Sequence, residues 1–182
     1  MFMKKKIVII AVAAVLVLAL AITGTVLLLK NAFNDNKGDD SSITSSGSSM
    51  RAVGEANIIV ESVEGSVGSR VKVPVKIEKN PGFMAALLKF KYDEKSLKYV
   101  TYHKGDFLTD YEIYDNKGTL SFICAENGDV KDNGAVVYLE FEILKDAKTS
   151  DVEVIVDSDT MLCNYDEQVI SIKGTNGKVT VK

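Results

Sequence analysis

Short stretches in which apolar and polar residues alternate recur along the second part of the chain. In Arg70–Glu78 (RVKVPVKIE) every second residue is valine or isoleucine. Successive side chains of a strand point to opposite faces, so this pattern predicts a strand with one buried face, bulged or at a sheet edge near Pro74. No stretch has helical periodicity, and nine or so strand signals at short spacing predict an all-β sandwich or barrel. The strands expected are 57–63, 70–78, 81–93, 97–102, 111–114, 119–125, 135–144, 152–156, 168–173 and 178–182.

The stretch 81–93 (PGFMAALLKFKYD) has an unusual second face. One set of alternating side chains is apolar to its end: Met84, Ala86, Leu88, Phe90 and Tyr92. The other set is Phe83, Ala85, Leu87, Lys89 and Lys91. An outer face is expected to be wet and polar, so Ala85 and Leu87 require a cover from outside the sheet.

The first part of the chain is organised differently. Ile7–Leu29 contains no charged residue and follows three lysines. About 20 apolar residues span a bilayer, and basic residues stay inside, so we expect a single-pass membrane anchor within residues 1–30 and an extracellular remainder. The alternative is a signal peptide cleaved near Ala19-Leu20-Ala21, which would leave a secreted protein; the apolar run continues well past that site and favours the anchor.

Residues 31–50 are rich in serine and are expected to form a flexible, disordered linker. Residues 51–182 are then one domain of ordinary size. Of the 22 basic and 25 acidic residues in the chain, five lysines and three aspartates precede residue 51, which leaves 17 and 22 and a net charge of −5. This charge argues against nucleic acid or an anionic membrane surface as a partner of the domain.

Candidate chemistry is sparse. His103 is the only histidine, and a lone histidine is more often a surface residue than a catalytic base. No nucleophile motif, phosphate-binding loop or zinc pattern occurs, so we expect no enzyme activity and no metal or cofactor.

Two further features leave alternatives open. The expected loop 126–134 carries oxygen ligands without EF-hand spacing and is a solvated turn rather than a calcium site: Asn127, Asp129, Asp132 and Asn133. Cys124 and Cys163 could pair in an exported protein, but both lie in apolar runs, which slightly favours free thiols.

The order of several short motifs resembles a cohesin domain over about residues 56–182. The motifs are Gly65–Val75 (GSVGSRVKVPV), Tyr92–Leu97 (YDEKSL), Lys104-Gly105-Asp106, Ala125-Glu126, Asp132-Asn133-Gly134 and Gly177–Val181 (GKVTV). The resemblance implies a nine-stranded jelly-roll sandwich, without catalytic activity, that binds a dockerin. A dockerin is a small helical module that carries its own calcium.

The resemblance also implies a site. The strand 82–91 would lie in the dockerin-binding sheet, and the partner's helix would cover Ala85 and Leu87. Type I cohesins have polar residues at these two positions, so the apolar pair argues against type I specificity. The partner-binding residues expected by this comparison are Ala85, Leu87, Lys89, Asp110, Tyr114, Ile123, Glu126 and Glu167. Charged side chains around an apolar centre have the layout of an interface core and rim.

We therefore expect a monomeric, non-catalytic module, anchored in the cell membrane, that captures dockerin-bearing enzymes or scaffold proteins at the bacterial surface. The alternative is a carbohydrate-binding or adhesin β-sandwich. Seven tyrosines are available to stack on sugars, but the chain has no tryptophan.

Overall fold

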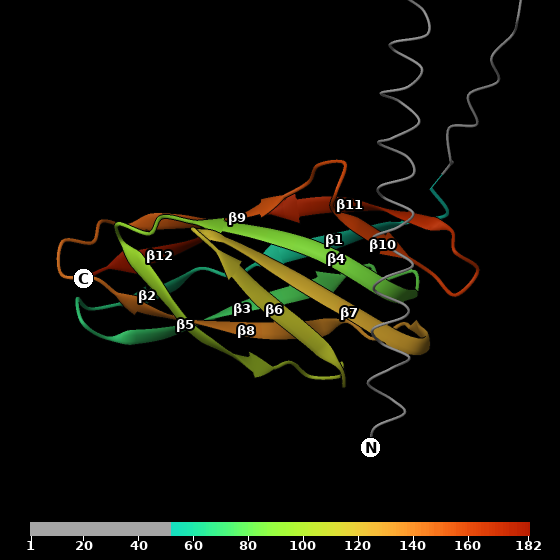
Figure 1. Cartoon of the computed structure of the whole chain (residues 1–182), viewed down its shortest axis with the longest axis horizontal. Coiled ribbons are helices and arrows are strands. Elements are labelled where there is room, and N and C mark those ends of the chain that lie inside the picture. The colour runs from blue at the N-terminus through green and yellow to red at the C-terminus, as the bar shows by residue number, and fades with distance from the viewer. Residues whose placement is uncertain (1–51) are drawn as a thin grey trace, which may run out of the picture. The chain divides into compact units, whose positions relative to one another are not determined.

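The computed structural model describes residues 52–182 (Figure 1). The predicted anchor, the linker and residue 51 lie outside the described residues. No helix within residues 52–182 is long and apolar enough to cross a membrane. The described part of the chain has twelve strands: β1 (Glu55–Val60), β2 (Val63–Gly65), β3 (Arg70–Glu78), β4 (Phe83–Tyr92), β5 (Leu97–Lys104), β6 (Tyr111–Asn116), β7 (Thr119–Val130), β8 (Gly134–Ile143), β9 (Ser150–Ile155), β10 (Met161–Cys163), β11 (Val169–Thr175) and β12 (Gly177–Val181).

The strands form two layers that share one strand (Figure 1). The back sheet has the order β5-β8-β3-β1-β11, and only β1 and β11 pair in parallel. In the front sheet β6 pairs with β7 and β7 with β4, while the other edge of β4 is occupied by β9 and β10 in turn. The strand β9 also pairs with β12, which pairs with β2, and β10 also pairs with β11. Because β11 pairs with β1 of the back sheet as well, it joins the two sheets. The all-β sandwich expected from the sequence is confirmed.

The core lies between the two sheets. The alternation in β3 places Val71, Val73, Val75 and Ile77 inward, as predicted. Large aromatic side chains meet across the layers, and the rings of Tyr92 in β4 and Phe141 in β8 are 5.1 Å apart. Such tilted aromatic contacts add to the stabilisation from burial alone.

A tight hairpin and a strand irregularity each follow from the residues present. Asp115-Asn116-Lys117-Gly118 makes the β6–β7 hairpin, in which Asn116 faces Thr119 and the two residues between them have positive φ, 49° at Lys117 and 80° at Gly118. Such a pair of left-handed residues matches the twist of a tight hairpin. The β3–β8 pairing is irregular between Val75 and Lys76, directly after Pro74, as the missing N–H predicted.

The strand count and several boundaries were wrong. The described residues form twelve strands, not the nine that the resemblance implies; of the ten expected stretches, 57–63 divides into β1 and β2, and the three-residue β10 was not expected. The expected loop 126–134 is strand as far as Val130. Phe83 was assigned to the outer face, but it is buried in the core with 1% exposure. The cause is a break in register: Phe83 pairs with Val130, whereas Ala85 pairs with Ala125, so strict alternation does not hold across Met84.

Candidate functional site: the outer face of the front sheet

Two rows of apolar side chains cross the outer face of the front sheet. Directly opposed residues of neighbouring strands share a face, so the pairings define these rows. The first row joins Ile123, Leu87 and Met161 across β7, β4 and β10. The second row runs beside it across β7, β4, β10 and β11: Ala125, Ala85, Cys163 and Val169. We call these seven residues the apolar rows.

The apolar rows are neither core nor ordinary surface. Leu87, Ile123 and Met161 are half-buried, and Ala85 is the most enclosed member with 7% exposure. Their faces point away from Leu88, Phe122 and Leu162, which alternate with them and fill the core. The first row has long side chains, and we call it the ridge; the second row has mostly small side chains. A contiguous apolar surface of this kind marks an interaction site.

Three of the remaining predicted residues lie around this surface. Tyr114 in β6 and Lys89 in β4 are both paired with Ser121 of β7, so they belong to the next row of the same face. Tyr114 is 57% exposed. Asp110 is exposed and directly precedes β6, where continuation of the β6–β7 register brings it opposite Ala125.

The two predicted glutamates are not on the apolar rows. The carboxylate of Glu126 accepts a hydrogen bond from the backbone N–H of Thr109 at 3.0 Å, and its other oxygen lies 3.1 Å from the Thr109 hydroxyl, so it secures the loop before β6. Glu167 is exposed in the β10–β11 turn, with a left-handed φ of 59°. The neighbouring Tyr165 is 63% exposed. Glu167 and Tyr165 thus lie at the end of the face where β10 turns into β11.

Lys89 is held by its own chain. Its ammonium group donates to Asp159 Oδ2 at 2.9 Å and to Asp157 Oδ2 at 3.3 Å, and only 19% of its side chain is exposed. Burial by itself lowers the pKa of Lys89, but the hydrogen bonds to Asp159 and Asp157 outweigh this effect and raise the pKa above its ordinary value. The amine is therefore committed to the β9–β10 connection.

Sequence reasoning missed four members of the apolar rows: Ala125, Met161, Cys163 and Val169. Met161 and Cys163 belong to β10, which is too short to give an alternation signal. Their only local signal is a run of three apolar residues, Met161-Leu162-Cys163, between polar stretches.

The two cysteines are free. They belong to strands on opposite sides of β4: Cys124 pairs with Ala86, and Cys163 pairs with Ala85. Since Ala85 and Ala86 point to opposite faces, one thiol is in the core and the other is on the outer face. Burial raises the pKa of Cys124 to about 12, and burial also raises the pKa of Cys163.

Two side chains of the oxygen-rich stretch 126–134 accept hydrogen bonds from backbone N–H groups. Asp129 Oδ1 accepts a hydrogen bond from the Tyr165 N–H at 2.7 Å, which joins the end of β7 to the β10–β11 turn. Asn133 Oδ1 accepts from the Asn80 N–H at 3.1 Å. Within residues 52–182 no three histidine, cysteine, aspartate or glutamate side chains gather as metal ligands would.

His103 lies on the outer face of the back sheet. Its Nε2 is 2.5 Å from Glu140 Oε2, and Arg70 contacts the other carboxylate oxygen at 3.3 Å. The hydrogen bond from His103, with a smaller contribution from Arg70, lowers the pKa of Glu140. The three side chains form a local cluster around the buried carboxylate of Glu140.

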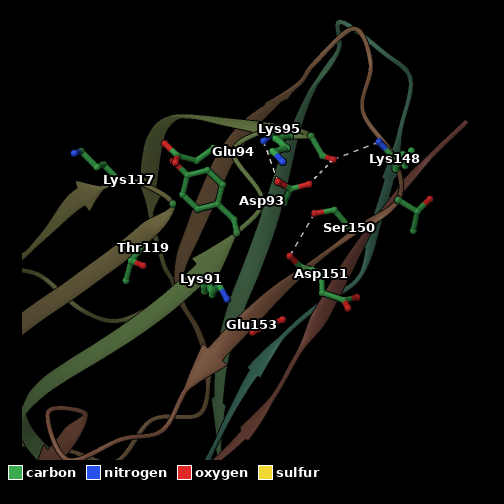
Figure 2. Close-up of a pocket in the computed structure, with 14 residues that line it drawn as sticks. Lys91, Asp93, Glu94, Lys95, Lys117, Thr119, Lys148, Ser150, Asp151 and Glu153 are labelled. Carbon is green, nitrogen blue, oxygen red and sulfur yellow. Dashed lines mark hydrogen bonds between the residues drawn. The ribbon is translucent and has the colours of Figure 1, made fainter.

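A shallow groove lies at the other end of the front sheet from the β10–β11 turn (Figure 2). Its walls carry lysines and carboxylates in similar numbers, and hydrogen bonds among them shape the turns. Asp93 accepts from the Lys95 N–H at 3.0 Å and from the Ser96 hydroxyl at 2.8 Å, which fixes the turn between β4 and β5. These bonds keep the pKa of Asp93 below its ordinary value. The groove is thus a feature of loop structure, separate from the apolar rows.

A β-sandwich with an apolar outer face and few chemically reactive groups is typical of a recognition module. Comparison with known proteins gives the family. The cohesin domain model matches residues 56–181, which is more than half of the chain, so the chain belongs to the cohesin family and has a single cohesin domain. No curated protein matches it.

Solved cohesins have the same fold. The sixth cohesin of scaffoldin B from Acetivibrio cellulolyticus, solved with a mutant Cel5 dockerin, is 24% identical over 70% of this chain and 99% of that chain, with a TM-score of 0.65. The cohesin of OlpC from Clostridium thermocellum, solved with Doc435, is 22% identical over 79% and 99%, with a TM-score of 0.65. A non-cellulosomal cohesin from the archaeon Archaeoglobus fulgidus is 18% identical over 70% and 91%, with a TM-score of 0.63.

These comparisons bear on the sandwich alone. Because the matches span 99% of two solved chains, each of those chains consists of little besides this sandwich. In this chain the compact unit that contains the sandwich is residues 50–182.

Proposed function

We propose that this chain binds a dockerin through the outer face of the front sheet. Family membership supports a non-catalytic protein-binding role, and two solved relatives are in complex with dockerins. The observation that carries the proposal is the pair of apolar rows, which supply the water-excluding centre that a protein interface needs. Tyr114 and the exposed acidic side chains provide the surrounding rim, and a tyrosine in this position is a common hot spot.

The character of the face indicates the kind of contact. Ala85 and Leu87 lie at the middle of the apolar rows, with Ile123 and Met161 on either side of Leu87. An amphipathic helix that lies across β7, β4 and β10 can place its apolar stripe on this ridge. The site is therefore suited to a dockerin whose docking helix has apolar residues where it meets these strands.

Binding of purified dockerins to residues 50–182 tests the proposal. Titration calorimetry with dockerins encoded by the same organism should give at least one saturable, calcium-dependent interaction that a chelator abolishes, since the dockerin requires calcium to fold. Binding to glycans with no response to any dockerin would instead support the carbohydrate-binding alternative, which the family match does not favour.

We further propose that the captured protein is held at the cell surface. This rests on the uncharged run Ile7–Leu29 and the serine-rich stretch 31–50, which would tether the domain and give it reach. Fractionation of cells should then recover the full-length chain in the membrane pellet. A chain found only in the medium and trimmed near Ala21 would indicate a secreted protein.

A further inference from the structure

The edge of β4 is occupied by two strands with an interruption between them. Ile155, the last residue of β9, pairs with Lys89, and Met161, the first of β10, pairs with Leu87. The chain thus advances by six residues, from Ile155 to Met161, while its pairing moves by only two residues along β4, from Lys89 to Leu87. Residues 156–160 leave the sheet in this interval, and we call them the excursion loop.

The excursion loop is folded around Asp157. Its Oδ1 accepts a hydrogen bond from the backbone N–H of Asp159 at 3.0 Å and lies 3.0 Å from the Thr160 hydroxyl. The Thr160 N–H donates to the Asp157 carbonyl at 3.2 Å. Burial by itself raises the pKa of Asp157, but these hydrogen bonds and Lys89 have the larger effect, so its pKa lies below the ordinary value. The Thr160 hydroxyl also lies 2.9 Å from the carbonyl oxygen of Ile155, so the loop has a defined shape and is tied to the end of β9, but these bonds do not tie it to β4.

Lys89 attaches the excursion loop to β4. It bridges Asp157 and Asp159 from the outer face of β4, two residues from Leu87. The pairing of β10 covers three residues with β4 and two with β11, so the backbone pairing that holds this strand in register is short. A slip of one residue would turn Met161 and Cys163 away from the outer face and expose Leu162.

We propose that Lys89 is a positioning residue for the docking face: by clamping the excursion loop it holds β10 in register, and so places Met161 and Cys163 in the apolar rows. This inference rests on the proposed function for its consequence in binding. It differs from the expectation that Lys89 contacts the partner directly, since its ammonium is already paired within the chain.

The first test needs no partner. In Lys89→Met the clamp is lost but the apolar stem is kept; Lys91→Met, on the same face and without a bridge, is the matched control. N-ethylmaleimide should label Cys163 faster in Lys89→Met, and backbone amides of residues 156–163 should exchange about two- to fivefold faster, the scale of one partly exposed ion pair. Cys124 should stay unlabelled in the same samples and report an intact core. Labelling and exchange equal to wild type in Lys89→Met would overturn the clamp.

The second test uses the dockerin found by calorimetry. Lys89→Met and the variant Asp157→Asn/Asp159→Asn, which removes both acidic partners, should each weaken binding about two- to fivefold, and their combination should lose no more than either, because both remove the same pair of bridges. The melting temperature should change little. If Lys89→Met weakens binding but Asp157→Asn/Asp159→Asn does not, Lys89 contacts the partner and the inference is wrong.

The two failures are distinguishable. If no dockerin binds the wild-type chain, the proposed function fails, while labelling and exchange still decide the clamp. Salt gives a further check: because Asp159 is 61% exposed, about 1 M sodium chloride should screen the bridge and accelerate Cys163 labelling in wild type but not in Lys89→Met.

Discussion

Replacement of Leu87 by aspartate is the sharpest test of the docking face. Leu87 lies in the ridge between Ile123 and Met161, where a partner would remove its remaining exposed surface from water. Complete burial of a leucine side chain is worth about 1.5–3 kcal/mol, and Leu87 is already half-buried, so the apolar loss alone is near the lower figure. A buried, unpaired carboxylate adds a further cost. We therefore expect Leu87→Asp to weaken dockerin binding by more than about 1.4 kcal/mol, a tenfold increase in Kd.

The fold offers a matched control. Ile59 is a half-buried apolar residue on the outer face of the back sheet, where it pairs with Lys76 of β3 and Thr175 of β11. Ile59→Asp makes the same kind of change in an inner strand of the other sheet. Both substitutions should lower the free energy of unfolding by roughly 1 kcal/mol through poor strand propensity. Only Leu87→Asp should affect binding.

Titration calorimetry gives Kd for both variants, and thermal melting followed by circular dichroism gives their stability. If Leu87→Asp binds the dockerin as tightly as wild type, the partner does not cover the apolar rows and the docking surface lies elsewhere. Equal losses of affinity in both variants would indicate that instability, rather than a lost contact, is responsible.

Three further predictions concern the sandwich itself. A chain of residues 50–182 should be soluble and show cooperative unfolding; aggregation would place the domain boundary elsewhere. Gly105→Ala should destabilise the fold strongly, because a Cβ there would lie 2.2 Å from the Ala135 carbonyl oxygen, whereas Gly128→Ala should melt like wild type, because its Cβ would meet open space; similar melting temperatures would contradict this packing. Burial raises the pKa of Tyr99 to about 12, and the pKa of Tyr92 is raised by burial and by Asp115. The folded state holds these protons more tightly than the unfolded chain, whose tyrosines titrate near pH 10. The free energy of unfolding, measured by denaturant titration, should therefore be constant below about pH 10 and fall between about pH 10 and 12. A constant free energy of unfolding across this range would refute the assignment.

The sequence predicts most strands well because their alternation is local. Arg70–Glu78 matches β3 residue for residue, since a run of valines and isoleucines between charged residues permits only one buried face. Phe83 was misplaced because its direction depends on the register break opposite β7, which no local pattern encodes. The strand β10 was missed for a similar reason: three residues become a strand only because β4 and β11 lie on either side of them.

The site was predictable only in part. Ala85 and Leu87 could be recognised because apolar residues on an outward face need a cover. The alignment of Ile123 and Met161 beside Leu87 depends on the register of three strands, and the sequence does not contain that register. Lys89 shows the opposite limitation: its type and position suggested a contact residue, but its acidic partners lie some 70 residues away in the chain.

An exposed apolar face raises the risk of self-association, and the charges around it act against this. Glu112 ends the first row beside Ile123, and Asp110, Glu126 and Glu167 lie at the margin of the face. Lys89, in the row beside Leu87, is neutralised by Asp157 and Asp159. Two copies stacked face to face would bring these carboxylates together, and like charges across an interface oppose docking. The same face can thus remain open to a partner of different charge, and for this reason we expect the domain itself to stay monomeric.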